Sequence, residues 1–149
     1  MPENGNAQFV FEQWHERIAR RDGEALSELY AADARFESPL VPRVLDCDRG
    51  YLQGRSDIRE FLIEITRRRP QGNELPSLYR DGTYFFDGRM LIWEYPRLTP
   101  QGSQLDLVEV MELDGSQIRN HRVYWGWYGT EHLLRNAVAK LKVDGATSP

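Results

Sequence analysis

The sequence predicts an α+β domain in which three helices near the start of the chain pack on a strongly curved antiparallel sheet. Up to about residue 65, apolar side chains recur every three to four positions, which is typical of amphipathic helices. From residue 75 onward they recur every two positions, between turns rich in aspartate and glycine. Helices that precede a run of strands indicate an α+β fold whose helices cover one face of the sheet.

Two helices are expected before residue 31. The first spans residues 9–21 and ends at a polar corner that contains Asp22 and Gly23. The side chains spaced for its buried side are Val10, Trp14 and Ile18, with Phe11 alongside. A second, short helix follows, with Leu26, Leu29 and Tyr30 on one side.

The third helix is expected to begin at Ser56, whose hydroxyl can cap it, and to end before Pro70. Its buried stripe is Ile58, Phe61, Leu62 and Ile65. The arginine run 67–69 falls at the end of this helix, where cations complement the helix dipole, so we interpret it as structural. Segment 40–53, which precedes the helix, is either a lid over a pocket or an ordinary surface loop.

The second half of the chain is predicted to form an antiparallel meander between residues 75 and 128. Four stretches with turn chemistry separate its strands: Asp81-Gly82, Asp87-Gly88, Thr99-Pro100-Gln101-Gly102 and Asp114-Gly115. The side chains between them are mostly aromatic or branched, as strands favour. Which face of the middle strand, 90–98, points inward is left open by the pattern.

One strand carries a carboxylate in an apolar row. Alternation over residues 105–113 places Glu109 on the same face as Leu105, Leu107, Met111 and Leu113. A buried carboxylate is costly unless it is paired, protonated or engaged in chemistry. Glu109 is therefore a candidate acid or base. The structural alternative is an ion pair with Arg97, Arg119 or Arg122.

The last strand combines a histidine with several aromatic rings. Alternation predicts that one face carries Arg119, His121, Val123, Trp125 and Trp127. The opposite face carries Asn120, Arg122 and Tyr124. Because imidazole exchanges protons near neutral pH, His121 is a candidate proton shuttle, or else a satisfied wall residue. We expect His121 and Glu109 to face each other across an aromatic cavity.

Composition limits the classes of function. With 149 residues, 19 basic and 23 acidic side chains and a net charge of −4, the chain is expected to be one domain that does not bind nucleic acid. No stretch is apolar enough to span a bilayer and no signal peptide is evident, so we expect a cytoplasmic, non-membrane protein. We predict a flexible N-terminus at 1–8, the domain at 9–135 and a C-terminal tail at 136–149. Cys47 is the single cysteine, which excludes an intramolecular disulfide.

Two segments resemble a known family. The stretch ARRDGEALSELYAADARFESP and the later GRSDIREF are similar to the nuclear-transport-factor-2-like superfamily, which includes ketosteroid isomerases, SnoaL-like polyketide cyclases and limonene-epoxide hydrolases. The resemblance runs from about Phe9 to Tyr128. It implies a conical fold with a deep pocket between helices and sheet, no metal, and in many members a dimer formed through the outer sheet face.

The family's functional positions are partly retained. The resemblance places the isomerase base at Ser38 and the carboxylate of the closing strand at Val123, so both are absent, with His121 as the substitute for the second. It places an oxyanion-hole tyrosine at Trp14, the protonated carboxyl partner at Glu109 and the pocket tyrosine at Tyr30. The hydrolase arginine and aspartate fall near Tyr95 and Arg97, which breaks that catalytic arrangement.

These observations lead to a specific expectation of function. We predict a cofactor-independent cyclase or isomerase that uses acid–base chemistry on a hydrophobic, oxygenated small molecule, with Glu109 and His121 as catalytic residues. The residues predicted to contact the substrate are Trp14, Tyr30, Trp93, Tyr95, Arg97 and Trp125. No metal site is expected, because the histidines lack the spacing of metal ligands. The alternatives are a non-catalytic ligand-binding protein and an accessory or scaffold subunit, and a homodimer through the outer sheet face is expected.

Overall fold

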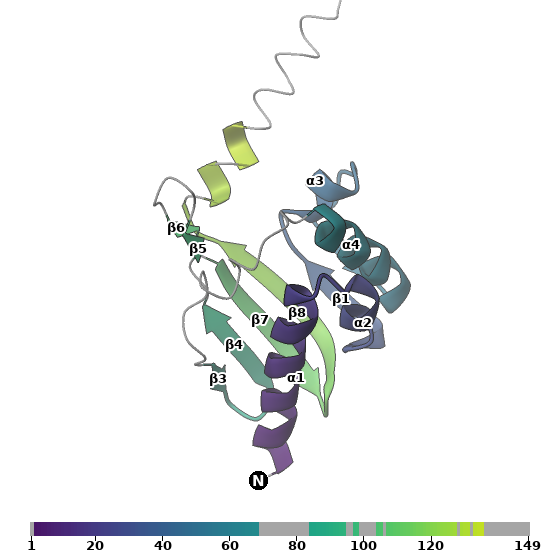
Figure 1. The fold of residues 1–149 in the computed structure, drawn as a ribbon, viewed down its shortest axis with the longest axis vertical. Coiled ribbons are helices and arrows are strands. Elements are labelled where there is room, and N and C mark those ends of the chain that lie inside the picture. Colours follow the sequence, from purple (N-terminus) through teal and green to yellow (C-terminus); the bar gives the residue numbers. More distant parts are fainter. Residues whose placement is uncertain are drawn as a thin grey trace, which may run out of the picture.

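The computed structural model describes residues 2–68, 84–94, 97–98, 104–105, 107–127, 129–131 and 133–135. In chain order its elements are α1 (Pro2–Ala19), α2 (Gly23–Ser27), β1 (Tyr30–Glu37), α3 (Val41–Val44), β2 (Tyr51–Gln53), α4 (Arg55–Arg68), β3 (Phe85–Phe86), β4 (Met90–Glu94), β5 (Arg97–Leu98), β6 (Gln104–Leu105), β7 (Leu107–Asp114) and β8 (Gln117–Trp125). In Figure 1, α1 crosses in front of β7 and β8, while α2 and α4 lie side by side next to β1. The α+β class is therefore confirmed. The predicted turns at 81–82 and 99–102 and the tail 136–149 lie outside the described residues.

The main sheet has six strands in the order β2-β1-β8-β7-β4-β3. All neighbouring pairs are antiparallel except β1 and β8, which run parallel and align Phe36 with His121. The expectation of an antiparallel sheet is wrong for this pair. Strand β1 escaped the sequence pattern because it begins Tyr-Ala-Ala-Asp-Ala, a composition with low strand propensity. It becomes a strand because β8 and β2 supply hydrogen-bond partners on its two sides.

The N-terminal helices differ from expectation at their ends. Helix α1 begins at Pro2 rather than Phe9, so residues 2–8 are helical, and Ala7 and Val10 are both buried. Helix α2 is a short helix whose first turn is capped by Asp22, which accepts a hydrogen bond of 2.9 Å from the Ala25 backbone N–H. The helix ends at Ser27, so Tyr30 belongs to β1 and not to the helix.

Segment 40–53 contains a fourth helix, where a loop was expected. The single-turn α3 occupies Val41–Val44 and Val41 is fully buried, while β2 closes the segment by pairing with β1. The Val44 carbonyl accepts a hydrogen bond of 3.3 Å from Arg68 Nη2 of α4. The structure thus has four helices before residue 69 where three were expected, because a four-residue helix with a proline at its second position leaves no periodic pattern to detect.

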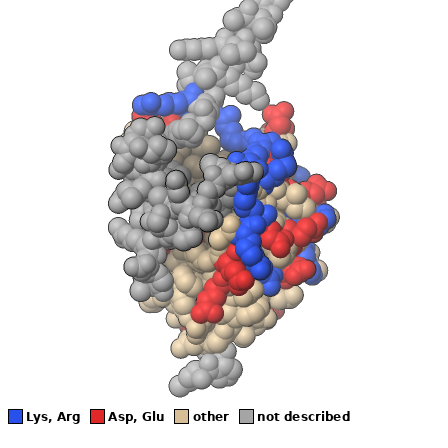
Figure 2. Space-filling model, in the orientation of Figure 1, with Lys and Arg blue, Asp and Glu red and all other residues tan. Residues whose placement is uncertain are grey.

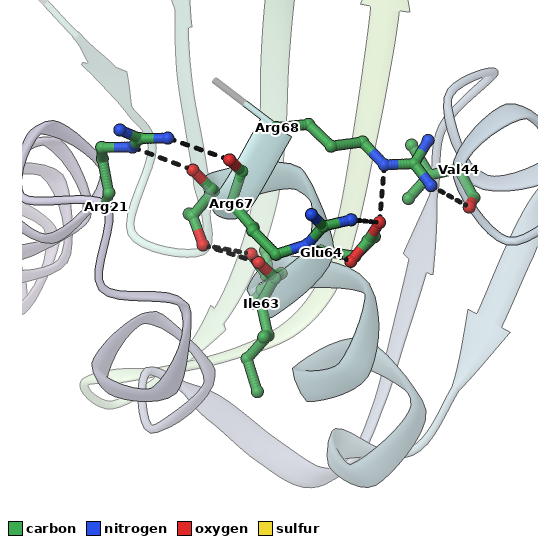
Figure 3. A network of polar contacts seen from close by, with 8 residues as sticks. Arg21, Val44, Ile63, Glu64, Arg67 and Arg68 are labelled. Atoms are coloured by element: carbon green, nitrogen blue, oxygen red, sulfur yellow. Dashed lines mark hydrogen bonds and ion pairs between the residues drawn. The ribbon is translucent and has the colours of Figure 1, made fainter. Parts of the chain in front are cut away.

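The arginines at the end of α4 are used within the fold. Arg67 and Arg68 both pair with Glu64, and these two partners lower the pKa of Glu64 to about 2 (Figure 3). Arg21, which follows the end of α1, donates hydrogen bonds to the last carbonyls of α4, at 3.1 Å from Thr66 O and 2.9 Å from Arg67 O. For Arg67 and Arg68, the structural interpretation is confirmed. Arg69 lies outside the described residues.

Charged side chains of both signs alternate over α2 and α4. Figure 2 shows basic and acidic groups next to one another on this side of the molecule. Arg59 pairs with Glu24 of α2, and Arg20 of the α1 end pairs with Glu16. This part of the surface therefore carries local ion pairs, and not a large patch of one charge.

A β-bulge in β8 decides which of its side chains face inward. The register with β7 shifts between Glu112 and Leu113, so that Glu112 aligns with Asn120 and Leu113 with Ile118. Arg119 is the extra residue. It is exposed and pairs with Asp33 and Asp114, which corrects its predicted place on the His121 face. Trp127 lies beyond the end of β8 and is 73% exposed, so it does not belong to that face either.

Candidate functional site

A chain of three buried polar side chains forms the centre of the candidate site. Glu109 of β7 is bonded to His121 of β8 through Oε2 and Nε2, and the other ring nitrogen, Nδ1, lies 2.7 Å from the Tyr30 hydroxyl of β1. The residues are 2%, 1% and 0% exposed, respectively. Glu109 is therefore paired with His121. Of the arginines that the sequence offered as alternatives, Arg119 pairs with Asp33 and Asp114.

Strand register explains why these groups meet. Glu109 aligns with Val123 and Met111 with His121, so Glu109 and His121 are diagonal neighbours on the inner face of adjacent strands. Leu107 and Met111 flank Glu109 on that face and are buried, as alternation predicted. The parallel neighbour β1 places Phe36 beside His121, with ring centroids 4.8 Å apart. Apolar packing thus holds the imidazole from the side.

The direction of the hydrogen bonds follows from the state of Tyr30. Burial raises the pKa of Tyr30 well above its usual range and the negative charge of Glu109 raises it further, against a smaller opposing effect of Trp14. The hydroxyl therefore keeps its proton and is assigned as donor to His121 Nδ1. In the neutral imidazole this leaves the proton on Nε2, which donates to Glu109. Glu109 is the final acceptor of the chain.

A partly enclosed cavity of about 150 Å³ lies over this chain. Most of its lining is apolar and comes from α1, β1, α4, β7 and β8. The lining residues are Trp14, Ile18, Phe36, Ser38, Leu40, Phe61, Leu62, Ile65, Leu107, Glu109, His121, Val123 and Trp125. Among them Leu40, Ile65, Val123 and Trp125 are half-buried and mark the more open end, whereas Glu109 and His121 lie at the buried end.

An aromatic cluster packs behind one wall of the cavity. The Trp93 ring lies 5.6 Å from Trp14, 5.2 Å from Phe11 and 5.2 Å from His15, measured between centroids. Burial lowers the pKa of His15, against a hydrogen bond to the Phe11 carbonyl and the charge of Glu109, which both raise it. His15 is thus favoured as a neutral ring within the wall.

The predicted site residues fall into three groups. Glu109, His121, Trp14 and Trp125 line the cavity. Tyr30 and Trp93 are buried behind it: Tyr30 bonds His121, and Trp93 packs on Trp14. Tyr95 and the side chain of Arg97 lie outside the described residues. The structure therefore places Tyr30 where it contacts His121 instead of a molecule in the cavity.

Sequence reasoning missed several lining residues. Phe36 was missed because β1 has no strand pattern, and Leu40 because it lies in a segment interpreted as a loop or lid. Phe61 and Ile65 were recognised as the buried side of a helix, but the spacing that reveals a buried face does not distinguish core from cavity wall. The positions where the resemblance expects carboxylates, Ser38 and Val123, both line the cavity.

Two further features bear on the class of site. Among the described residues, no three side chains of histidine, cysteine, aspartate or glutamate lie close enough to share a metal ion. Within the same part of the chain, no helix combines the length and the apolar character needed to cross a bilayer.

Comparison with known proteins agrees with this architecture. A SnoaL-like protein of unknown function from Burkholderia thailandensis superposes with a TM-score of 0.61 at 16% identity, over 83% of this chain and 97% of that chain. An NTF2-like protein of unknown function from Burkholderia xenovorans gives 0.60 at 16% identity, over 85% and 87%. A steroid delta-isomerase from Pseudomonas aeruginosa gives 0.55 at 21% identity, over 92% and 95%. At these identities the likeness establishes the fold alone.

Sequence comparison assigns the family. A search of curated proteins found no match. A family model of the SnoaL-like domain matches residues 11–121, which include the second half of α1, the hydrogen-bonded residues Tyr30, Glu109 and His121 and the cavity residues between them. Both the fold and this match lead to the same assignment: the chain belongs to the SnoaL-like domain family, within the NTF2-like fold.

Proposed function

We propose that this protein is a cofactor-independent enzyme that moves a proton next to a carbonyl group in a hydrophobic, oxygenated small molecule, in an isomerisation or cyclisation. The observation that carries the proposal is the Glu109–His121 pair, buried and bonded, at the inner end of an apolar cavity. Catalytic acids and bases work in such water-poor surroundings, and structural packing alone does not require a polar pair there.

Glu109 acts as the base in this proposal. One carboxylate oxygen, Oε2, accepts a hydrogen bond from His121 Nε2, which orients the group. The carboxylate removes a proton from the carbon next to the substrate carbonyl, and the electron pair of the broken C–H bond moves to the carbonyl oxygen as an enolate. Return of that proton to another carbon completes an isomerisation; attack of the enolate carbon on a second carbonyl completes a cyclisation, with the proton passing to the new alkoxide. Both routes regenerate the carboxylate.

Tyr30 takes a different role from that expected. It was expected to contact the substrate, but its hydroxyl bonds His121 Nδ1. Trp14 lines the cavity and remains a predicted substrate contact. We assign Tyr30 as a positioning residue that holds the imidazole in the Nε2–H form. The candidate donor to the substrate oxygen is Trp125, which lines the cavity and whose Nε1 has no hydrogen-bond partner among the described residues.

Binding without turnover is the second candidate function. It is favoured by Ser38 and Val123, which line the cavity at positions where the resemblance expects a catalytic carboxylate. Ser38 instead accepts a hydrogen bond of 3.2 Å from the Leu40 backbone at the start of α3. The cavity would then hold a ligand, and Glu109 and His121 would serve only to recognise it.

Exchange of substrate hydrogen for deuterium tests the proposal whatever the final product of the reaction is. Small cyclic ketones are incubated with the protein in D₂O, and loss of the C–H signal next to the carbonyl is followed by proton NMR. We expect enzyme-dependent exchange that Glu109→Gln reduces by about a hundredfold or more, in the range of a lost general base. The matched control is Glu112→Gln, on the outer face of the same strand, where Glu112 pairs with Arg89.

The two candidates give different results in this experiment. An enzyme shows exchange that depends on Glu109 and not on Glu112. A binding protein shows saturable ligand binding with no exchange above the buffer rate. Exchange that survives Glu109→Gln unchanged would contradict the role of Glu109 as base.

A further inference from the structure

The size of the cavity restricts what can reach the polar pair. Pockets for drug-sized ligands usually have volumes of about 300–1,000 Å³. The cavity here has about 150 Å³. An apolar cavity of about that volume in another protein binds one small ring, benzene. A fused ring system at Glu109 would therefore have to displace side chains at the open end, such as Ile65 and Trp125.

The charge of the lining restricts the ligand further. No lysine or arginine is among the described residues that line the cavity. The Glu109 carboxylate at the inner end of the cavity is bonded to His121 and repels a ligand anion. Among the lining residues that the structure describes, the polar side chains are Ser38, Glu109 and His121, in addition to the indole rings. A ligand with one polar oxygen matches this set, whereas a second charged or strongly polar group would be buried without a partner.

The walls favour a flat molecule. Phe36 and Phe61 pack at 5.1 Å between ring centroids on one side, and the indoles of Trp14 and Trp125 also line the cavity. Rings of this kind present large, rigid apolar surfaces to a planar ligand. Volume, charge and wall shape thus point to the same kind of molecule.

We infer that the substrate portion bound beside Glu109 and His121 is a single, uncharged six-membered ring that carries one polar oxygen, as in a simple cyclic ketone or phenol. This inference rests on the proposed function for its catalytic meaning and concerns the same cavity. It excludes a polycyclic substrate that is enclosed as a whole and excludes ligands with a carboxylate or phosphate on the ring.

Binding of three fluorinated probes tests this inference independently of turnover. The full chain is titrated with 4-fluorophenol, 4-fluorobenzoate and 6-fluoro-2-naphthol at pH 7, and binding is followed by fluorine NMR. We expect saturable binding of 4-fluorophenol and at least about tenfold weaker binding of 4-fluorobenzoate, because like charges repel in a poorly solvated site. The naphthol buries more apolar surface, so hydrophobicity alone predicts that it binds more tightly. We expect the opposite, namely that the naphthol binds at least about tenfold more weakly than the phenol. That result would identify a size limit, because hydrophobicity cannot explain it.

Variants at the open end locate the binding site. Ile65→Trp fills the cavity and is expected to weaken 4-fluorophenol binding by at least about tenfold, a change comparable to other overpacked sites. Ile63→Trp on the same helix is the matched control, because Ile63 lines a surface groove with Arg21 and Thr66 instead. Trp125→Ala enlarges the cavity and is expected to restore naphthol binding to within about threefold of the phenol.

Each outcome has a defined meaning. No saturable phenol binding, naphthol binding as tight as the phenol, or benzoate binding as tight as the phenol would each overturn the inference. Equal effects of Ile65→Trp and Ile63→Trp would also overturn it, because binding would then lie elsewhere. If the probes rank as expected but Glu109→Gln leaves deuterium exchange unchanged, the proposed chemistry fails while the ligand class stands.

Discussion

The Tyr30 hydroxyl and His121 Nδ1 lie 2.7 Å apart, on the side of the imidazole away from Glu109. The two residues are far apart in sequence and meet because β1 runs parallel to β8. Each ring nitrogen of His121 thus has one fixed partner. A histidine held in this way has a defined tautomer, and the partner of one nitrogen determines what the other can do.

The first prediction concerns this tautomer. In the wild type we expect His121 to carry its proton on Nε2, because Tyr30 donates to Nδ1. Tyr30→Phe removes that donor and leaves Nδ1 buried without a partner, which should cost about 1–3 kcal/mol of stability. Long-range ¹H–¹⁵N correlation spectra of the histidines report the tautomer directly. An Nδ1–H form of His121 in the wild type would contradict the assigned direction of the hydrogen bonds from Tyr30 through His121 to Glu109.

The second prediction concerns alkaline pH. Because burial raises the pKa of Tyr30 above its usual range, the unfolded chain releases this proton first as the pH passes about 10. The contribution of Tyr30 to stability is therefore complete below that pH and declines above it, by up to about 1.4 kcal/mol per pH unit. Urea unfolding between pH 8 and 11 should show the wild type losing stability faster than Tyr30→Phe. Parallel curves would show that Tyr30 ionises normally in the fold.

The third prediction concerns acid pH and His15. Burial lowers the pKa of His15, so the folded protein keeps this ring neutral at pH values where the unfolded chain protonates it. The stability that depends on neutral His15 is present above about pH 6.5 and is lost as the pH falls below it. The stability difference between wild type and His15→Gln should therefore shrink from pH 7 to pH 5, as measured by urea unfolding. A constant difference would contradict the inferred shift.

The fourth prediction concerns the contact between α2 and α4. A Cβ atom at Gly23 would lie 2.6 Å from the Cα and N atoms of Ile63, closer than atoms can approach without a backbone shift. We expect Gly23→Ala to reduce the free energy of unfolding by about 1–3 kcal/mol. Gly5 in α1 is the matched control, since a Cβ atom there has no neighbour within 4 Å. Gly5→Ala should stabilise the helix by about 0.5–1 kcal/mol; equal effects of the two changes would contradict the packing argument.

The fifth prediction concerns assembly, for which we propose a homodimer through the outer sheet face. Ile92, Val108 and Val110 are half-buried there and Tyr124 is 55% exposed, and strand register places them in neighbouring positions across β4, β7 and β8. Val110→Asp should convert a dimer to a monomer in native mass spectrometry, because it buries a charge in an apolar contact. Phe9→Asp, at an exposed position of α1, should leave the subunit number unchanged. A monomeric wild type would refute the proposal.

Local patterns predicted much of the fold because they are properties of the backbone itself. Alternation alone placed Glu109 among buried apolar residues, and Asp114-Gly115 marked the hairpin in which Gly115 has a φ of 60°. Helical spacing identified the buried sides of α1 and α4. Strand β1 and helix α3 were missed, because an Ala-rich strand and a four-residue helix that contains a proline give no periodic signal and are stabilised by neighbours distant in sequence.

By itself, the sequence determined that a carboxylate and an imidazole lie on inward faces of two late strands, since side chains alternate along any strand. Only the tertiary structure decided what they touch. Glu109 and His121 meet through the register of β7 and β8, and Tyr30 joins them because β1 pairs in parallel with β8. The bulge at Arg119 places that side chain outside this group. The physical reason is that facing direction is fixed by local backbone geometry, whereas contact depends on strand pairing between residues far apart in the sequence.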